Sequence, residues 1–276
     1  MKNRKSTVIL LLCFFVGLSV MLYPSLANFW NSKHQSQAIV DYEKMLQNLP
    51  LQDYNAMFEA AEQYNRELFA LPDPLRQYRQ LENYYELLDL DGRGMMGYVT
   101  IEKIGQELPL YHGTSDSVLA FAVGHMQGTS LPAGGANTHC VLSAHRGLPS
   151  ATLFTYLDRL EIGDTFTVTV LDKVFTYEVD QIEIVQPSDA SLIRVEEGQD
   201  HCTLLTCTPY GINTHRLLVR GKRVSSVSAK PIHITSQAYR VDTLIVMPIV
   251  AMPMLAVLTL YVIFAPVKKE STGDDL

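Results

Sequence analysis

The chain has 276 residues and a formal net charge of −7, which suits one domain of ordinary size with additional segments at its ends. The acidic total argues against nucleic acid as a partner, because nucleic-acid-binding proteins present a basic surface to the phosphates. Two long uncharged stretches near the ends of the chain indicate attachment to a membrane instead.

The first uncharged stretch follows the basic start MKNRK. Its apolar run at 8–22 has the length of a signal peptide, and the small residues Ser25 and Ala27 would suit a cleavage site. The uncharged stretch continues to Ser32, however, which makes it long enough to span a bilayer. Residues 1–32 are therefore expected to be a retained anchor or a cleaved signal segment, and both place the following domain outside the cytoplasm.

The second uncharged stretch, at 243–267, exceeds the roughly 20 residues needed to cross a bilayer. Its two prolines are tolerated in membrane helices. Lys268 and Lys269 follow directly, which by the positive-inside rule places the tail at 268–276 in the cytoplasm. We expect a C-terminal transmembrane helix here, joined by a linker at 226–242 to a domain on the extracellular face of the cell membrane.

Between these segments the chain changes from helical to β-type sequence. Residues 35–70 contain good helix formers with apolar residues at three-to-four spacing, and Pro50 is expected to divide them into two helices. A second short helix is expected at 79–90, within an N-terminal helical region at 33–96. Seven or eight short runs rich in Val, Ile, Thr and Tyr follow at 97–225, and they predict a mainly β fold, a closed or nearly closed barrel.

A cysteine, a histidine and an arginine form a pattern typical of thiol catalysis. Cys207 ends the run CTLLTC before a Thr-Pro turn, His145 ends the run CVLSAH, and Arg216 opens the next run. A thiolate can attack a carbonyl, an imidazole can exchange protons, and a guanidinium can hold the resulting oxyanion. On spacing alone, Cys207 can equally be a buried small hydrophobe and Arg216 the partner of a carboxylate.

The motif TLLTC followed by HRLLVRG resembles the signature of the sortases, cysteine transpeptidases of Gram-positive cell surfaces. The segments GYVTIEKI, LPLYHGTS, LSAHRGLP and TPYGINTHR extend the resemblance over residues 40–225, and it is closest to the pilus-building class C sortases. The resemblance implies a closed sortase-type β-barrel of about eight strands. It also implies Cys207 as the nucleophile, His145 as the general acid and base, and Arg216 as the clamp for oxyanion and substrate.

The resemblance implies a reaction in two halves. Cys207 attacks the Thr–Gly bond of an LPxTG-type sorting signal and forms a thioacyl enzyme, while His145 protonates the departing amine. A lysine amine of a pilin subunit then resolves the thioester into an isopeptide bond. The stretch at 185–200 corresponds to the loop that helps to choose the sorting signal in this family.

Three alternatives stay open. A related enzyme would attach proteins to cell-wall peptidoglycan, a thiol hydrolase would let water resolve the thioester, and a scaffold module would have no chemistry at all. If the protein instead builds pili, as the resemblance implies, its expected partners are pilin subunits with a sorting signal and an acceptor lysine, together with the membrane. Nucleic acid is not an expected partner.

Class C sortases resemble one another in an N-terminal lid that carries Asp-Pro followed by an aromatic residue. In LPDPL, Asp73 and Pro74 match this pattern, but Leu75 stands at the aromatic position. The resemblance implies that Asp73 pairs with Arg216 and that the third lid residue covers Cys207. An aliphatic residue lacks ring contacts to sulfur worth roughly 0.3–1.5 kcal/mol, so we expect a lid that closes less tightly. Alternatively, the prolines only form a rigid turn between helices.

The external domain has three cysteines, an odd number, so at least one thiol is unpaired. Cys140 lies five residues before His145, and Cys202 lies five residues before Cys207. If the two strands are parallel neighbours, as the resemblance implies, Cys140 and Cys202 lie at matching positions on the same face of the sheet. They then form either a disulfide bridge or two buried free thiols. No paired Cys/His spacing of the ligand type occurs, so neither a metal nor a cofactor is expected.

Overall fold

The structure is a computed structural model that describes residues 2–224. Its contacts divide the chain into two compact units, and the described residues contribute 2–26 to one and 27–224 to the other. The first unit contains the beginning of helix α1 (Lys2–Gln47). The segment Leu11–Gln47 is long and apolar enough to cross a membrane. The expected C-terminal transmembrane helix, its linker and the tail lie outside the described residues.

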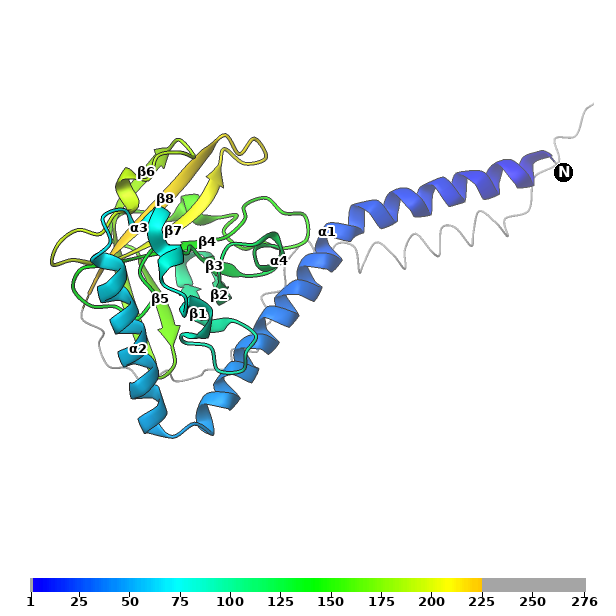
Figure 1. The fold of residues 1–276 in the computed structure, drawn as a ribbon. Coiled ribbons are helices and arrows are strands. Elements are labelled where there is room, and N and C mark those ends of the chain that lie inside the picture. The colour runs from blue at the N-terminus through cyan, green and yellow to red at the C-terminus, as the bar shows by residue number, and fades with distance from the viewer. Residues whose placement is uncertain (1, 225–276) are drawn as a thin grey trace, which may run out of the picture. The chain divides into compact units, whose positions relative to one another are not determined.

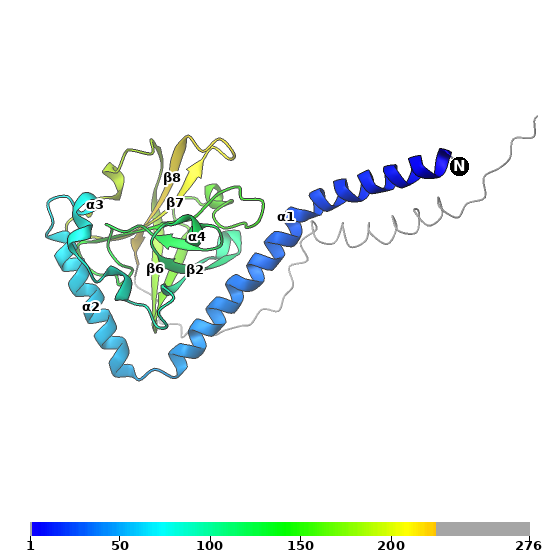
Figure 2. The ribbon, with the colours of Figure 1, turned by 45° about the vertical axis from the view of Figure 1, so that its right-hand side comes forward.

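The second unit is built on a closed barrel with the strand order β1-β2-β3-β4-β7-β8-β6-β5 (Figures 1 and 2). The strands are β1 (Met95–Ile101), β2 (Gln106–His112), β3 (Val123–His125), β4 (Thr138–Ser143), β5 (Thr165–Val170), β6 (Lys173–Val185), β7 (Asp200–Thr208) and β8 (His215–Arg223). Neighbours are antiparallel except for the parallel pairs β2–β3 and β4–β7. The predicted β-barrel is therefore confirmed, and the three-residue β3 is the strand that no sequence run indicated.

Helix α2 (Leu51–Phe69) lies along the barrel (Figures 1 and 2) and contributes to its main core. Ala61, Tyr64 and Leu68 are buried on its inner face, at the three-to-four spacing that the sequence shows. Pro50 directly precedes α2 and separates it from α1, as predicted. Each large side chain buried in this way contributes roughly 1.5–3 kcal/mol, so packing on the barrel stabilises the helix.

The second half of α1 is held to the barrel through Tyr42, whose side chain is fully buried. Its hydroxyl donates to the carbonyl of Met96 at 2.8 Å and accepts from the backbone N–H of Leu171 at 2.8 Å. Tyr42→Phe leaves both backbone groups without this partner, so we expect the free energy of unfolding to fall by about 1–3 kcal/mol. Urea unfolding measures this change. Tyr85→Phe, at a ring that is 59% exposed, is the matched control, and an equal loss in both variants would contradict the prediction.

The prediction of a short helix at 79–90 was wrong. The structure has helix α3 (Pro74–Gln77) followed by two 3-10 turns, η1 (Tyr78–Gln80) and η2 (Tyr84–Glu86). Tertiary contacts override the local propensity, since the buried Tyr84 hydroxyl lies 2.8 Å from Nδ1 of His125 in β3. Leu88 has a φ of 60°, a left-handed conformation that interrupts a right-handed helix.

Candidate active site

Two strand pairings bring the candidate residues to one rim of the barrel. In the parallel pair β4–β7, the last matched residues are Ser143 and Leu205, so His145 and Cys207 each lie two residues further along. In the antiparallel pair β7–β8, Cys207 is directly opposite Arg216. The expectation that the strands of His145 and Cys207 are parallel neighbours is confirmed.

Hydrogen bonds around this rim hold the ends of β4 and β7 together. The backbone N–H of Ala144 donates to the carbonyl of Leu205 at 3.2 Å. The buried Thr206 hydroxyl donates to the carbonyl of Ala144 at 2.8 Å. Because side chains alternate along a strand, the half-buried Cys207 points to the opposite face from Thr206, away from the barrel interior.

The guanidinium of Arg216 is oriented by the turn that precedes β8. Its Nη1 donates to the carbonyl of Asn213 at 3.3 Å and to that of His215 at 3.1 Å. Within residues 2–224 no carboxylate forms an ion pair with Arg216, so its charge is not neutralised there. A fixed guanidinium next to a half-buried thiol is suited to bind a developing oxyanion.

Asp73, in the segment LPDPL, has a different partner from the one that the resemblance implied. Its Oδ2 lies 3.5 Å from Nε of Arg76, which is one turn along and largely exposed. The implied Asp73–Arg216 pair is therefore not the arrangement of this structure. The reason is local, because Asp73 precedes α3 and its carboxylate reaches the nearby arginine of the same short helix.

Leu75, in the same segment, packs on the outer face of the barrel. It belongs to an apolar cluster with Val141 of β4, Leu205 of β7 and Ile193 of the loop that precedes β7. Leu205 and Cys207 are two residues apart in one strand, so they share a face. Leu75 therefore packs on the apolar cluster of Val141, Ile193 and Leu218, against which Leu205 of β7 also packs, and a lid that covers Cys207 stays a prediction.

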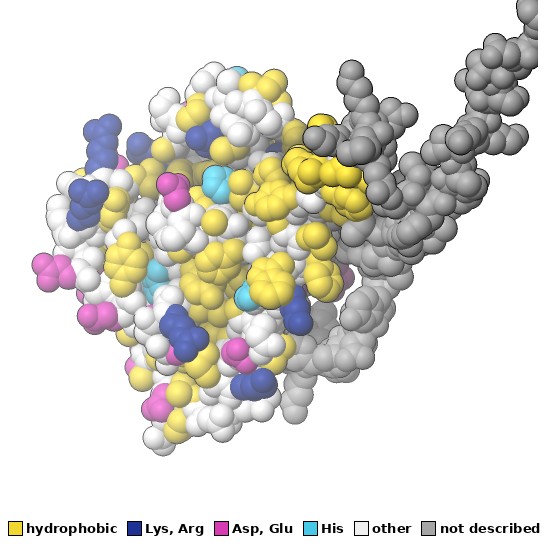
Figure 3. Space-filling model, turned by 90° about the vertical axis from the view of Figure 1, so that its right-hand side faces the viewer, with side chains coloured by type: hydrophobic (Ala, Val, Ile, Leu, Met, Phe, Trp, Pro, Cys, Tyr) yellow, Lys and Arg dark blue, Asp and Glu magenta, His cyan; other side chains and the backbone are white. Residues whose placement is uncertain are grey.

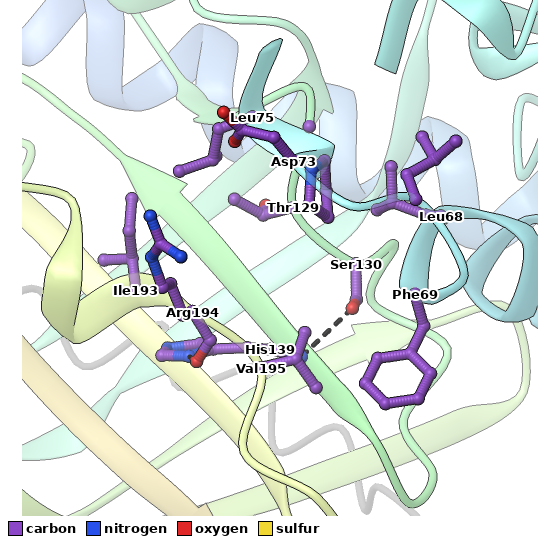
Figure 4. A pocket seen from close by; sticks show the side chains of 13 residues that line it. Leu68, Phe69, Asp73, Leu75, Thr129, Ser130, His139, Ile193, Arg194 and Val195 are labelled. Atoms are coloured by element: carbon purple, nitrogen blue, oxygen red, sulfur yellow. Dashed lines mark hydrogen bonds between the residues drawn. The ribbon is translucent and has the colours of Figure 1, made fainter. Parts of the chain in front are cut away.

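A cavity of about 190 Å³ lies between the segment 68–75 and the loop that precedes β7. Figure 4 shows Asp73 and Leu75 on one side of it and Arg194 on the other, with His139 below. The buried His139 ring has Nδ1 2.9 Å from the carbonyl of Arg194 and Nε2 2.7 Å from Oγ1 of Thr203. Burial lowers the pKa of His139 to about 4, so this imidazole is neutral at pH 7 and both its nitrogens are engaged.

The other two cysteines of the barrel lie in its interior. Cys140 and Cys202 are directly opposite each other on β4 and β7, and the structure has them as two buried free thiols. Burial raises the pKa of Cys202 well above the ordinary thiol value, and the neighbouring Cys140 adds to this effect. Cys207 is therefore the accessible thiol among the three.

Sequence reasoning missed a second arginine at the rim. Arg146 directly follows His145, and its Nη1 lies 3.4 Å from Oγ1 of Thr208, the residue after Cys207. Its Nη2 forms an ion pair with Asp158. The only signal in the sequence is the position of Arg146 next to the candidate histidine.

A thiol, an arginine and a histidine at one rim of the barrel are groups suited to covalent acyl transfer through a thioester. Residues 99–224 match the family model of the Sortase domain. The crystal structure of sortase C1 from Streptococcus agalactiae is 45% identical, with a TM-score of 0.63, and the match covers 68% of this chain and 98% of that chain. Sortase C of Streptococcus pneumoniae is 41% identical, with a TM-score of 0.62, over 68% of this chain and 97% of that chain.

Among curated proteins, Sortase D of Bacillus subtilis is 34% identical over 132 residues. That match covers 47% of this chain and 64% of the relative, so the chain spans just under two thirds of its length. The chain belongs to the sortase family of cysteine transpeptidases, and its solved structural neighbours include class C sortases.

Proposed function

We propose that this protein is a membrane-anchored transpeptidase that cleaves an LPxTG-type sorting signal and joins pilin subunits through a lysine isopeptide bond. The observation that carries the proposal is the strand register, in which Cys207 faces Arg216 and His145 continues the parallel strand next to it. The acceptor is inferred from the likeness to class C sortases, one of which, from Streptococcus pneumoniae, is described with pilin substrate specificity.

In the first half of the reaction, the thiolate of Cys207 attacks the carbonyl carbon of the threonine in the signal. The negative charge that develops on the carbonyl oxygen is stabilised by Arg216, whose described hydrogen bonds engage Nη1 and leave its other N–H groups for the substrate. The C–N bond then breaks, and His145 gives a proton to the leaving amine of glycine. The products are a thioester on Cys207 and the released C-terminal part of the signal.

In the second half, a lysine ε-amine of another pilin attacks the thioester carbon. His145 takes a proton from this amine, the carbon–sulfur bond breaks, and Cys207 returns to the thiolate. Arg216 stabilises the second oxyanion as it did the first. The same three residues therefore exchange one amide for another without a net change in the enzyme.

The proposed location is the outer face of the cell membrane, with the apolar helix segment Leu11–Gln47 supplying an anchor. On the face drawn in Figure 3, basic and acidic side chains of the described residues are interspersed. This face has no basic patch of the kind that binds phosphates.

The proposed function is tested with the full chain in detergent, an LPxTG-type peptide, and a pilin domain with a candidate lysine. Mass spectrometry is expected to find an acyl adduct on Cys207 and a new isopeptide between peptide and pilin. Hydrolysed peptide without conjugate would favour a hydrolase, and transfer to a peptidoglycan precursor amine alone would favour wall attachment. No adduct would overturn the proposal.

The lid is proposed to limit access to the thiol. Leu75→Ala removes a side chain that is partly buried against the apolar cluster of Val141, Ile193 and Leu218, and it forfeits about 1 kcal/mol of apolar burial. This corresponds to about a fivefold shift of the lid toward its open position. We therefore expect Cys207 to react about five times faster with a thiol reagent. Asp73→Ala is expected to have less effect, because its ion pair with Arg76 is exposed.

The matched controls lie in the same chain. Cys140 and Cys202 are buried in the barrel, so their labelling reports unfolding rather than lid opening. An increase confined to Cys207 supports the lid. Unchanged labelling of Cys207 in Leu75→Ala and Asp73→Ala would show that LPDPL is only a turn between helices.

A further inference from the structure

We propose that Arg146 is a positioning residue that keeps His145 and Cys207 in register, an inference that rests on the proposed transpeptidase function. Arg146 makes no described contact with the thiol or with Arg216. It acts on the two strand ends that carry the reacting side chains. It thereby continues the alignment of β4 and β7 beyond the point where their backbone pairing ends.

The register of the two strands shows this continuation directly. Backbone pairing of β4 with β7 runs from Thr138 with Asp200 to Ser143 with Leu205. One residue further, the hydroxyl of Thr206 donates to the carbonyl of Ala144.

Three residues beyond the last pair, the guanidinium of Arg146 reaches the hydroxyl of Thr208 at 3.4 Å. Both side-chain bonds keep the same offset of 62 positions along the chain. His145 and Cys207 have the same offset and lie between them. The catalytic pair is therefore bracketed by two side-chain contacts, and Arg146 supplies the outer one.

The guanidinium is braced from its other side by Asp158, with which Nη2 forms an ion pair. Asp158 belongs to the 3-10 turn η4 (Leu157–Arg159), and this turn is anchored in the core by Leu157, whose side chain is fully buried. The neighbouring Phe154 is also buried, and its N–H donates to the carbonyl of His145 at 3.1 Å. Arg146 therefore connects the rim to a rigid part of the barrel.

The arginine side of this contact is shielded from solvent, whereas the carboxylate of Asp158 is 48% exposed. The side chain of Arg146 is 10% exposed, and its Nε is buried without a hydrogen-bond partner. A charge with so little solvent depends on its protein partners, so its position is tied to Asp158 and Thr208. Displacement of reacting groups by about 1 Å costs about a hundredfold in rate.

The experiment measures kcat and KM for peptide transfer by the full chain in detergent, with acyl adduct formation on Cys207 in the wild type as the reference. Arg146→Gln is expected to lower kcat by about tenfold to a hundredfold with KM nearly unchanged. The pH profile is expected to keep its shape, because the protonating groups stay the same. Arg146→Lys is expected to recover part of the rate, since it retains the charge but not the fork.

Three further variants show whether the effect travels through the described contacts. Asp158→Asn is expected to lower kcat, and the double variant with Arg146→Gln to be no slower than Arg146→Gln alone. Thr208→Val, which removes the hydroxyl at constant shape, is expected to give a smaller loss in the same direction. Arg159→Gln is the charge-matched control, because Arg159 stacks 4.0 Å above Tyr156 and has no described contact with the rim.

Loss of stability is separated from loss of positioning by Tyr42→Phe, which is expected to destabilise the domain far from the rim and to leave kcat unchanged. The inference is overturned if Arg146→Gln has a kcat within about twofold of the wild type, or if only KM rises. It is also overturned if the pH profile shifts, which would indicate a charge effect on the reacting groups. If the wild type forms no adduct, the proposed function fails first and the inference fails with it.

Discussion

Replacing Cys207 with alanine is expected to abolish both the acyl adduct and the conjugated product while the barrel stays folded. The thioester cannot form without the sulfur, and neither of the other two barrel thiols can substitute, since Cys140 and Cys202 are buried. The fourth cysteine, Cys13, lies in helix α1 and not at the rim of the barrel. Covalent catalysis depends on this one atom, so the expected loss is complete within the detection limit of the assay. Mass spectrometry of the enzyme after incubation with an LPxTG-type peptide, together with gel analysis of conjugates, measures it.

The matched control is Cys140→Ala, which removes a thiol of the same chemistry from the interior of the barrel. It is expected to affect stability but to leave an adduct on Cys207. An adduct or conjugate that persists in Cys207→Ala would show that Cys207 is not the nucleophile. In that event the class of scaffold module or a different catalytic residue would have to be considered.

Arg216→Ala is expected to reduce kcat by about a hundredfold to a thousandfold, because the loss of an oxyanion donor typically costs about 3–4 kcal/mol in the transition state. Arg216 lies directly opposite Cys207 in the sheet, so its guanidinium is placed to reach a carbonyl oxygen at the thiol. The kcat of Arg216→Lys is expected to lie between those of Arg216→Ala and the wild type, because an ammonium keeps the charge without the planar arrangement of donors. Steady-state kinetics of peptide cleavage measure both variants.

Lys222→Ala provides the control for this prediction. Lys222 is an exposed cation on the same strand, at the end remote from Cys207, so its removal changes the net charge equally but not the rim. Its kcat is expected to equal that of the wild type. A turnover of Arg216→Ala close to that of the wild type would contradict the assignment of Arg216.

The barrel and the rim were predictable because they depend on periodicity and spacing along the chain. Short runs rich in Val, Ile, Thr and Tyr identified seven of the strands. The equal spacing from Cys140 to His145 and from Cys202 to Cys207 aligns the two strand ends as soon as the strands are parallel neighbours. Their matched register in the structure has this alignment.

The partners of the residues expected to form a lid depend on contacts that no spacing encodes. The resemblance implied that Asp73 pairs with Arg216, whereas in the folded chain Asp73 pairs with Arg76. The helix predicted at 79–90 does not form for a similar reason. A tertiary contact, the hydrogen bond of the buried Tyr84 hydroxyl with His125 of β3, overrides the local helix propensity. A strand of three residues is too short to have a recognisable period.

The sequence by itself determined the apolar N-terminal segment, the β-barrel and the three candidate residues at its rim, because each rests on a local pattern of residue types. The tertiary structure alone decided which partner Asp73 takes, that Cys140 and Cys202 are buried free thiols, and that Arg146 connects Thr208 to Asp158. These are contacts between segments far apart in the chain or choices between nearby partners. They are settled by burial and by the geometry of side chains in the packed barrel, which a pattern along one chain does not contain.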